Sequence, residues 1–316
     1  MTLDFSEILV TGGAGFIGSN LVDRLIDEGF NVRVLDNLST GDKKNLARHK
    51  DNKNFQFIEG DIRNFDLVKK ITKGVDAVFH EAALVSVTQS VENPILSNEM
   101  NVTGTVNLLN ACVLNNVKRF VFASSCSVYG DTEIQPQHEN LIPKPLSPYA
   151  ASKMAAEYYV KVFHTVYGLE TIILRYFNVY GPRQKYGPYS GVISVFINNL
   201  LEDSPLTIYG DGTQTRDFVN VKDVIEANIC TLSSENCEGD VFNIGTGKAI
   251  SIVEIANTIQ KIMDKTDLGI IFAESRPGEI MQSYADIDKA RKSIKYEPET
   301  SIETGLKEII EWYTNQ

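Results

Sequence analysis

A glycine-rich turn, Thr11–Gly18, stands directly between an apolar run, Glu7–Val10, and an amphipathic helical pattern, Phe16–Glu28. Its glycines are spaced G-x-x-G-x-x-G, and they permit a tight turn and close approach of a ligand to the backbone. The N–H groups at the start of a helix also attract phosphate. The turn therefore predicts a β-α-β unit that binds the diphosphate of a dinucleotide. The residues assigned to that contact are Gly12, Gly15, Phe16, Ile17 and Gly18.

The first half of the chain alternates short β-branched runs with longer helical patterns, which is typical of a parallel sheet. Six strands are expected, at Glu7–Val10, Val32–Leu35, Phe55–Glu59, Ala77–His80, Arg119–Ala123 and Thr171–Arg175. Later helices are expected at Val221–Leu232, Ile252–Lys265 and Ile302–Tyr313. The predicted fold is α/β, a doubly wound (Rossmann) parallel sheet with a smaller mixed α/β domain. We place the first domain at residues 1–178, with late segments returning to it, and the second mostly at 179–316.

The charge balance limits the partners of this chain. Its 316 residues include 30 Lys and Arg against 41 Asp and Glu, a formal net charge of −11. Such a surface repels phosphate backbones, so neither nucleic acid nor a membrane is an expected partner. The four cysteines form no C-x-x-C pair and have no histidine at ligand spacing, so no metal site is predicted. No apolar run of 18 residues and no signal sequence is found, which predicts a cytoplasmic protein.

Acidic residues follow the second and third expected strands. Asp36 lies 18 residues after Gly18 and is followed by Asn37. A carboxylate at this place can accept hydrogen bonds from both hydroxyls of an adenosine ribose and repels a 2′-phosphate, which favours NAD over NADP. A carboxylate that only caps a turn is the alternative. Asp61 and Ile62 are expected beside the adenine, although a plain turn explains them nearly as well.

Tyr149 and Lys153 are four residues apart at the start of a predicted helix, where Ser147 suits the N-cap and Pro148 the first helical position. The spacing puts phenol and ammonium on one face. A tyrosine, with an ordinary pKa near 10, is a poor base at pH 7 unless a nearby positive charge lowers its pKa. An isolated pair of this kind is usually a solvated helix face. Here the fifth strand also runs into a hydroxyl-rich segment, Ser124–Gly130, which favours a catalytic site.

The sequence resembles the extended short-chain dehydrogenase/reductases, and among them the NAD-dependent nucleotide-sugar epimerases, over almost the whole chain. The matching segments, in chain order, are Thr11–Gly18, Asp36-Asn37, Gly60-Asp61, His80–Ala83, Asn101, Ser124–Gly130, Tyr149 with Lys153, Arg175–Gly181 and Thr215–Asp217. The resemblance implies NAD as the cofactor, with Ala82, Ala83 and Asn101 beside it. It also implies Tyr149 as the base, Lys153 on the nicotinamide ribose and Ser125 as the catalytic hydroxyl.

One departure separates this chain from the 4,6-dehydratases that the resemblance also includes. Those enzymes carry Thr-Asp-Glu where this chain has Ser125-Cys126-Ser127. The acid and base that expel water are therefore missing at this point. The resemblance favours oxidation followed by return of the hydride, and disfavours dehydration.

The resemblance also implies a UDP-sugar as substrate in the second domain. It assigns Asn178 to a phosphate or the sugar, Arg216 and Arg276 to the diphosphate, and Thr207 and Tyr209 to the uracil side. Two arginines suit a diphosphate because forked guanidinium groups match its oxygens.

Small side chains are expected around the sugar. Ser283 falls where the family places the residue over the 2-substituent, and a serine leaves room for an N-acetyl group. Ser86 and Ser127 are expected to contact the same sugar, and the stretch 184–191 is similar to members that act on N-acetylated sugars. Small side chains admit a large substrate without excluding a small one.

The predicted function is reversible C4 epimerisation of a UDP-hexose through a transient 4-keto sugar. The expected pair is UDP-N-acetylglucosamine and UDP-N-acetylgalactosamine, with UDP-glucose and UDP-galactose as further substrates. Two alternatives remain. A UDP-glucuronate 4-epimerase or decarboxylase would need cations such as Arg183 and Lys185, and a non-catalytic NAD-binding sensor would be expected to have lost Tyr149, Lys153 or Ser125.

The resemblance further implies a homodimer. In the family, the helix after Asn98 and the helix that begins at Pro148 pair with their copies in a four-helix bundle. The first of these is free of charge from Met100 to Val117. Packing of both helices inside one chain is the alternative.

Overall fold

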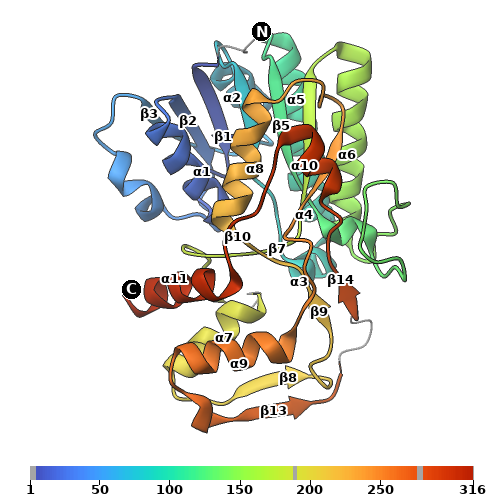
Figure 1. The fold of residues 1–316 in the computed structure, drawn as a ribbon. Coiled ribbons are helices and arrows are strands. Elements are labelled where there is room, and N and C mark those ends of the chain that lie inside the picture. Colours follow the sequence, from blue (N-terminus) through green and yellow to red (C-terminus); the bar gives the residue numbers. More distant parts are fainter. Residues whose placement is uncertain (1–4, 188–190, 276–279, 316) are drawn as a thin grey trace.

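A parallel sheet forms the larger part of the structure, a computed structural model that describes residues 5–187, 191–275 and 280–315 (Figure 1). Its strands are β1 (Glu7–Thr11), β2 (Asn31–Asp36), β3 (Phe55–Glu59), β4 (Ala77–His80), β5 (Arg119–Ser125), β6 (Glu170–Tyr176) and β11 (Val241–Ile244). They lie in the order β11-β6-β5-β4-β1-β2-β3, and all neighbouring pairs are parallel. The six predicted strands and the α/β class are confirmed.

Helices cover both faces of this sheet. One face packs on α1 (Phe16–Asp27), α8 (Val221–Ser233) and α10 (Asp288–Ile294), and the other on α2 (Phe65–Ile71), α5 (Gly104–Leu114) and α6 (Pro148–Tyr167). Alternate residues of β1 enter the two cores, with Val10 in the first and Leu9 in the second. Strands buried on both faces read as continuous apolar runs, which is why the sequence pattern finds them.

The second region lies below the sheet in Figure 1 and has a core of its own. It contains α7 (Val192–Leu201), β8 (Leu206–Tyr209), α9 (Ile252–Ile262), β13 (Ile270–Ala273) and α11 (Ile302–Thr314). Short strands join it to the sheet: β7 (Asn178–Tyr180) with β10 (Phe218–Asn220), and β9 (Thr215–Arg216) with β12 (Ile250–Ser251) and β14 (Gln282–Ser283). The remaining elements are α3 (Val87–Glu92), α4 (Pro94–Asn98), η1 (Lys43–His49), η2 (Glu99–Thr103), η3 (Cys126–Tyr129) and η4 (Thr266–Leu268).

Two predicted helices differ from the observed ones. The helix predicted to reach Lys265 ends at Ile262, because Asp264 adopts a left-handed conformation with φ of 54°. The charge-free stretch from Met100 to Val117 begins with a π-helical turn, η2, before α5. Hydrophobic periodicity does not distinguish these backbone changes from a regular helix.

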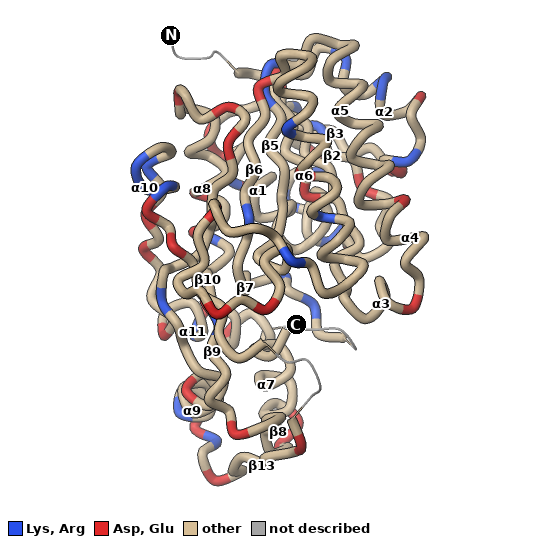
Figure 2. The backbone as a smooth tube through the Cα atoms, turned by 90° about the vertical axis from the view of Figure 1, so that its right-hand side faces the viewer, with Lys and Arg blue, Asp and Glu red and all other residues tan. Residues whose placement is uncertain are grey.

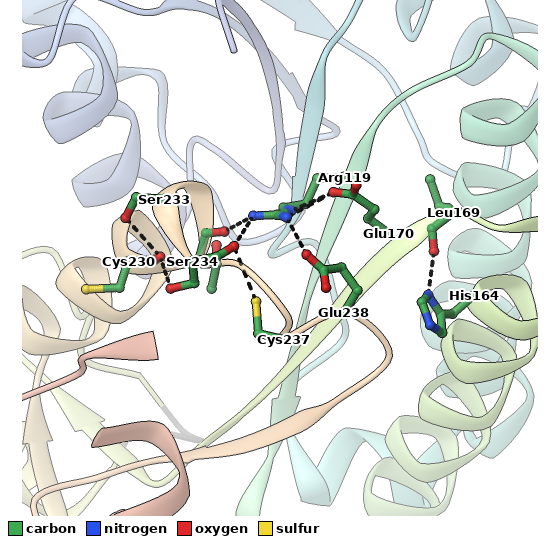
Figure 3. Close-up of polar contacts among 10 residues, drawn as sticks. Arg119, His164, Leu169, Glu170, Cys230, Ser233, Ser234, Cys237 and Glu238 are labelled. Carbon is green, nitrogen blue, oxygen red and sulfur yellow. Dashed lines mark hydrogen bonds and ion pairs between the residues drawn. The ribbon is translucent and has the colours of Figure 1, made fainter. Parts of the chain in front are cut away.

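A buried arginine holds the late strand β11 beside the early strands (Figure 3). Arg119, at the start of β5, is fully buried, and its Nη2 lies 2.9 Å from Glu170 and 2.8 Å from Glu238. Its Nη1 donates to the carbonyls of Thr231 and Ser234 at the end of α8. The division of the chain at residue 178 stays a prediction, and the sheet takes one strand from beyond it.

Within the described part of the chain, no helix is long and apolar enough to cross a membrane. The same residues contain no group of three or more His, Cys, Asp or Glu side chains that could hold a metal ion.

Candidate active site

The glycine-rich turn lies between the carboxyl ends of β1 and β4 and the start of α1. Gly12 has a φ of 69°, and a Cβ there would lie 2.7 Å from the backbone nitrogen of Ala82. A Cβ at Gly18 would lie 2.3 Å from the carbonyl oxygen of Gly12. The N-cap residue of α1 is Gly15, so no side chain hydrogen-bonds to the first N–H groups of the helix. This cradle fits the diphosphate of a dinucleotide, with the half-buried Phe16, Ile17, Ala82 and Ala83 around it.

The Asp36 carboxylate is fixed at the end of β2. Its Oδ2 accepts a hydrogen bond from the backbone nitrogen of Ala14 at 2.9 Å, and its Oδ1 accepts one from that of Leu38 at 2.7 Å. Each carboxylate oxygen can accept a second bond, so both remain able to receive a ribose hydroxyl. Turn capping and ribose binding are therefore compatible. Gly41 packs so closely that a Cβ there would lie 2.9 Å from Asp36 Oδ1, a contact that the sequence analysis missed.

Asp61 is held by neighbours rather than left open. Arg63 Nη2 and Asn37 Nδ2 each donate to its Oδ2 at 2.9 Å, and the Arg63 hydrogen bond lowers the pKa of Asp61 to about 2. Ile62 is buried beneath α5, where a Cβ at Gly104 would lie 2.4 Å from its side chain. Asp61 thus orients Asn37, the residue that follows Asp36.

The helix α6 carries Tyr149 and Lys153 into the interior at the end of β5. Ser147 Oγ caps it by accepting from the Ala150 nitrogen at 3.2 Å, and the Tyr149 nitrogen donates to Ser90 Oγ at 3.0 Å. Lys153 Nζ donates to the carbonyl of Ala123 at 2.8 Å. Both side chains are buried, so the predicted pair is not a solvated helix face.

Burial controls the ionisation of this pair. It raises the pKa of Tyr149 to about 12, and a hydrogen bond with the Ser125 hydroxyl acts in the opposite direction. Burial lowers the pKa of Lys153 to about 8, against the charges of Glu81 and Glu157, which raise it. From the sequence, the lysine is the group expected to lower the tyrosine pKa. In the structure, the group that favours the phenolate is Ser125.

Asn101 lies in the π-helical turn η2 and contacts α6. Its Nδ2 donates to Ser152 Oγ at 2.9 Å, and its side chain also exchanges hydrogen bonds with the backbone of Leu84. Its contact with α6 is therefore through Ser152, the neighbour of Lys153. Single π turns are frequent at functional sites.

A cavity of about 330 Å³ lies in the second region, lined by residues of α7, β7, β8, β9 and β10. Four residues predicted for the substrate line it together: Asn178, Thr207, Tyr209 and Arg216. Gln184, from the stretch 184–191 that the sequence singles out, also lines the cavity, as do Gln214 and Phe196, which no sequence pattern marks. The cavity thus offers amide, hydroxyl and guanidinium groups beside aromatic surface, which suits a nucleotide.

A thiol connects this cavity to the buried pair. The Cys126 side chain has hydrogen-bond contacts with Ser125 and Ser283, and the charge of Arg216 acts on it. Ser283 pairs with Arg216 in the register of β14 and β9. Ser283 is buried, and its Oγ lies 3.4 Å from Oε1 of Gln137. Contacts among Tyr149, Ser125, Cys126, Ser283 and Arg216 therefore link the buried pair to the cavity. Gln137 is a neighbour of Ser283 that no sequence pattern marks.

The other predicted substrate residues have different settings. Ser86 caps α3 by accepting from the Gln89 nitrogen at 3.1 Å. Ser127 Oγ is buried and has no hydrogen-bond partner among the described residues, so it can bind a ligand. Asn178 Nδ2 donates to the carbonyl of Asp217 at 3.2 Å. Arg276 lies outside the residues that the structure describes.

The sequence model of the NAD dependent epimerase/dehydratase family matches residues 8–245. The chain belongs to this family, and NAD is its cofactor. The matched range covers the glycine-rich turn, Asp36, Tyr149 and Lys153, which form the site described above.

Relatives match over the full length. One from Methanocaldococcus jannaschii is 44% identical over 314 residues, which cover 98% of each chain. A solved UDP-N-acetylglucosamine 4-epimerase from Methanobrevibacter ruminantium, in complex with UDP-N-acetylmuramic acid, is 40% identical, covers 99% of this chain and 100% of its own, and has a TM-score of 0.94. A UDP-glucuronic acid 4-epimerase from Bacillus cereus, solved with UDP-glucuronic acid and NAD, is 36% identical at 98% and 99% coverage, with a TM-score of 0.91.

We predict that the protein binds NAD at least about tenfold more tightly than NADP, and that Asp36→Asn narrows this ratio. The exchange removes the charge that repels a 2′-phosphate and keeps an acceptor for backbone N–H groups. Calorimetric titration of the apoprotein measures both affinities. Asp42→Asn, at a nearby half-buried carboxylate that caps η1, should leave the ratio unchanged. Equal affinities in the unmodified protein would contradict the assignment of Asp36.

Proposed function

We propose that the chain is a UDP-sugar 4-epimerase, and that its substrates are UDP-N-acetylglucosamine and UDP-N-acetylgalactosamine, with UDP-glucose and UDP-galactose as further substrates. The observation that carries this proposal is the continuous line from Tyr149 and Ser125 through Cys126 and Ser283 to Arg216 and the cavity. It joins a proton-transfer pair to a nucleotide-sized cavity. The name of the Methanobrevibacter ruminantium relative supports the same reaction.

In the proposed mechanism, Tyr149 removes the proton from the C4 hydroxyl of the sugar. The Ser125 hydroxyl, which already hydrogen-bonds with Tyr149, stabilises the phenolate and bridges to the substrate oxygen. NAD, when bound in the cradle around Gly12 and Gly18, would supply the hydride acceptor for C4 and the hydride donor for the return step. Lys153, anchored on the Ala123 carbonyl, would hold the nicotinamide ribose of bound NAD. Tyr149 finally returns its proton, so the net redox change is zero.

Inversion requires the 4-keto sugar to present its other face while UDP stays bound. Arg216 and Asn178 line the cavity at the end of the site and would hold the diphosphate there. Arg276 is the second arginine proposed for this contact. No cavity-lining side chain other than Arg216 is charged among the described residues, so the anion is met by guanidinium.

The surroundings of the sugar favour an uncharged hexose over a glucuronate. The two cations that the alternative needed are paired with acids of the cofactor region: Arg183 with Asp23 at 2.6 Å and Lys185 with Asp42 at 3.3 Å. A carboxylate on the sugar would have to compete with these pairs. The Bacillus cereus relative is named for UDP-glucuronic acid, so a panel of UDP-sugars with separation of the products is the direct test. Faster turnover of UDP-glucuronate than of both hexose pairs would contradict the proposal.

We predict that Tyr149→Phe lowers turnover by about 10²–10⁴-fold and changes substrate affinity little. The exchange removes the proton-transfer group and keeps the shape of the site. Turnover and UDP-sugar affinity are measured separately, with Tyr159→Phe, an exposed tyrosine on the same helix, as the matched control. Full activity of Tyr149→Phe would show that the base is wrongly assigned.

We predict that Ser283→Tyr impairs turnover of the N-acetylated pair by at least about tenfold more than that of UDP-glucose. The larger ring occupies the space beside Cys126 and Gln137 that an N-acetyl group would need. Gln282→Tyr, on the exposed neighbour in β14, is the control. Equal losses for both sugars would contradict the sugar assignment and leave the epimerase proposal intact.

We also propose that the protein is a homodimer. Large apolar side chains on one side of α6 are exposed: Tyr158, Tyr159, Val162, Val166 and Tyr167. Leu114 is exposed on the adjacent α5, which carries no charged residue (Figure 2). An apolar surface of this kind on two neighbouring helices suits a two-fold symmetric interface.

We predict a dimer mass by light scattering at micromolar concentration. The double variant Val162→Glu and Val166→Glu should be a monomer, because two charges would be buried at the proposed interface. The control is Ile271→Glu with Phe272→Glu, which changes two exposed apolar residues of β13 far from α6. A monomeric unmodified protein would refute the dimer.

A further inference from the structure

The carboxyl group of Glu81 lies at the ends of three central strands. The residue follows β4 directly, and its nitrogen donates to the carbonyl of Thr11 at the end of β1 at 3.1 Å. A Cβ at Gly12 would lie 2.9 Å from the Glu81 carbonyl carbon, so this backbone abuts the glycine-rich turn. The side chain extends to Tyr176 at the end of β6 and is half-buried.

A chain of hydrogen bonds orients this carboxyl group from one side. Asn228 Nδ2 of α8 donates to the Tyr176 hydroxyl at 2.8 Å, and that hydroxyl donates to Glu81 Oε1 at 2.8 Å. The Asn228 amide is itself fixed on the carbonyl of Val224. The second carboxyl oxygen, Oε2, has no partner among the described residues. Oε1 is thus fixed by the Tyr176 hydroxyl, and Oε2 is available to interact with a ligand.

The charged group that acts on Glu81 is the buried ammonium of Lys153. Burial raises the pKa of Glu81 to about 7, whereas the hydrogen bond from Tyr176 and the ammonium of Lys153 both favour the ionised carboxylate. The Tyr176 phenol is neutral, because burial raises its pKa well above the ordinary value. The neighbouring His80 is held between Thr11 and Thr105 and is also neutral, with its pKa lowered to about 3 by burial. A further positive charge in this space would therefore ionise Glu81 fully.

We propose that the Glu81 carboxylate faces the nicotinamide half of bound NAD and stabilises its positively charged, oxidised ring over the neutral, reduced ring. The position follows from two neighbours: the glycine-rich turn, which fits the diphosphate, and Lys153, which is proposed to bind the nicotinamide ribose. Glu81 lies between them. The inference rests on that placement of Lys153 and does not depend on which sugar is the substrate.

This function suits a reaction in which the hydride must return. A carboxylate beside the ring makes the reduced cofactor with 4-keto sugar the less stabilised state. Return of the hydride is then favoured over loss of the keto sugar. Glu81 is a positioning and electrostatic residue here, and the proton transfer remains with Tyr149.

The test compares the dissociation constants of NAD and NADH for the apoprotein in the absence of sugar. Glu81→Gln keeps an acceptor for Tyr176 and removes the charge. We expect the ratio of the two constants to shift by about tenfold in favour of NADH, equivalent to about 30 mV for this two-electron couple. In the holoenzyme with UDP-sugar, the fraction of cofactor in the reduced form, followed by nicotinamide absorbance, should rise.

Two further variants separate charge from structure. Tyr176→Phe breaks the hydrogen-bond chain and keeps the carboxylate, so its ratio should stay within about twofold of the unmodified protein. Glu81→Asp keeps the charge and should shift the ratio less than Glu81→Gln does. An unchanged ratio in Glu81→Gln, or an equal shift in Tyr176→Phe, overturns the proposal. Because no sugar is present in the binding measurement, these outcomes are independent of failure of the epimerase assignment.

Discussion

The active site depends on one buried ion pair between α6 and the sheet. Glu157 is fully buried, accepts from Arg175 Nε at 2.9 Å and Nη2 at 2.7 Å, and accepts from Ser124 Oγ at 2.5 Å. It lies one turn after Lys153 on α6, while Ser124 and Arg175 each immediately precede a site residue on β5 and β6. A single carboxylate therefore fixes the helix that carries the base against the strands that carry its partners. Breaking such a pair by removing one member costs about 3–5 kcal/mol.

A second buried carboxylate organises the substrate side in the same way. Asp217 is fully buried and accepts from the Thr246 nitrogen at 2.8 Å, the Thr246 hydroxyl at 2.7 Å and the Gly247 nitrogen at 2.9 Å. It also accepts from the Ala285 nitrogen at 3.2 Å. These donors come from two separate stretches of the chain, at residues 246–247 and at Ala285. These bonds position Arg216, the residue before Asp217, and the strand β14 that pairs with β9. A buried, hydrogen-bonded carboxylate therefore stabilises each end of the site: Glu157 at the catalytic end and Asp217 at the cavity.

The sequence predicted the features that depend on local spacing. The six strands, the glycine-rich turn and the buried pair of Tyr149 and Lys153 all have signatures within a few residues of one another. Contacts between distant residues have no such signature. The Tyr176 bond to Glu81 spans 95 residues, and no periodicity marks either partner. The same holds for Cys126, whose place beside Ser283 arises only when the loop after β5 meets β14. The burial of Arg119 could not be predicted for a related reason: from its residue type alone, an arginine is expected at the surface.

The order of the strands has a consequence for how the chain folds during synthesis. The edge strand β11 lies more than sixty residues later in the sequence than its partner β6. Arg119, at the start of β5, also takes part of its partners, two carbonyls and the Glu238 carboxylate, from beyond residue 230. In a nascent chain that ends just after β6, the edge of β6 is unpaired. Arg119 then lacks several of the partners that satisfy it in the folded protein. Such an edge is a template for wrong pairing. The sheet can therefore gain its last strand only after roughly the first 245 residues have been synthesised, and α10 covers it later still.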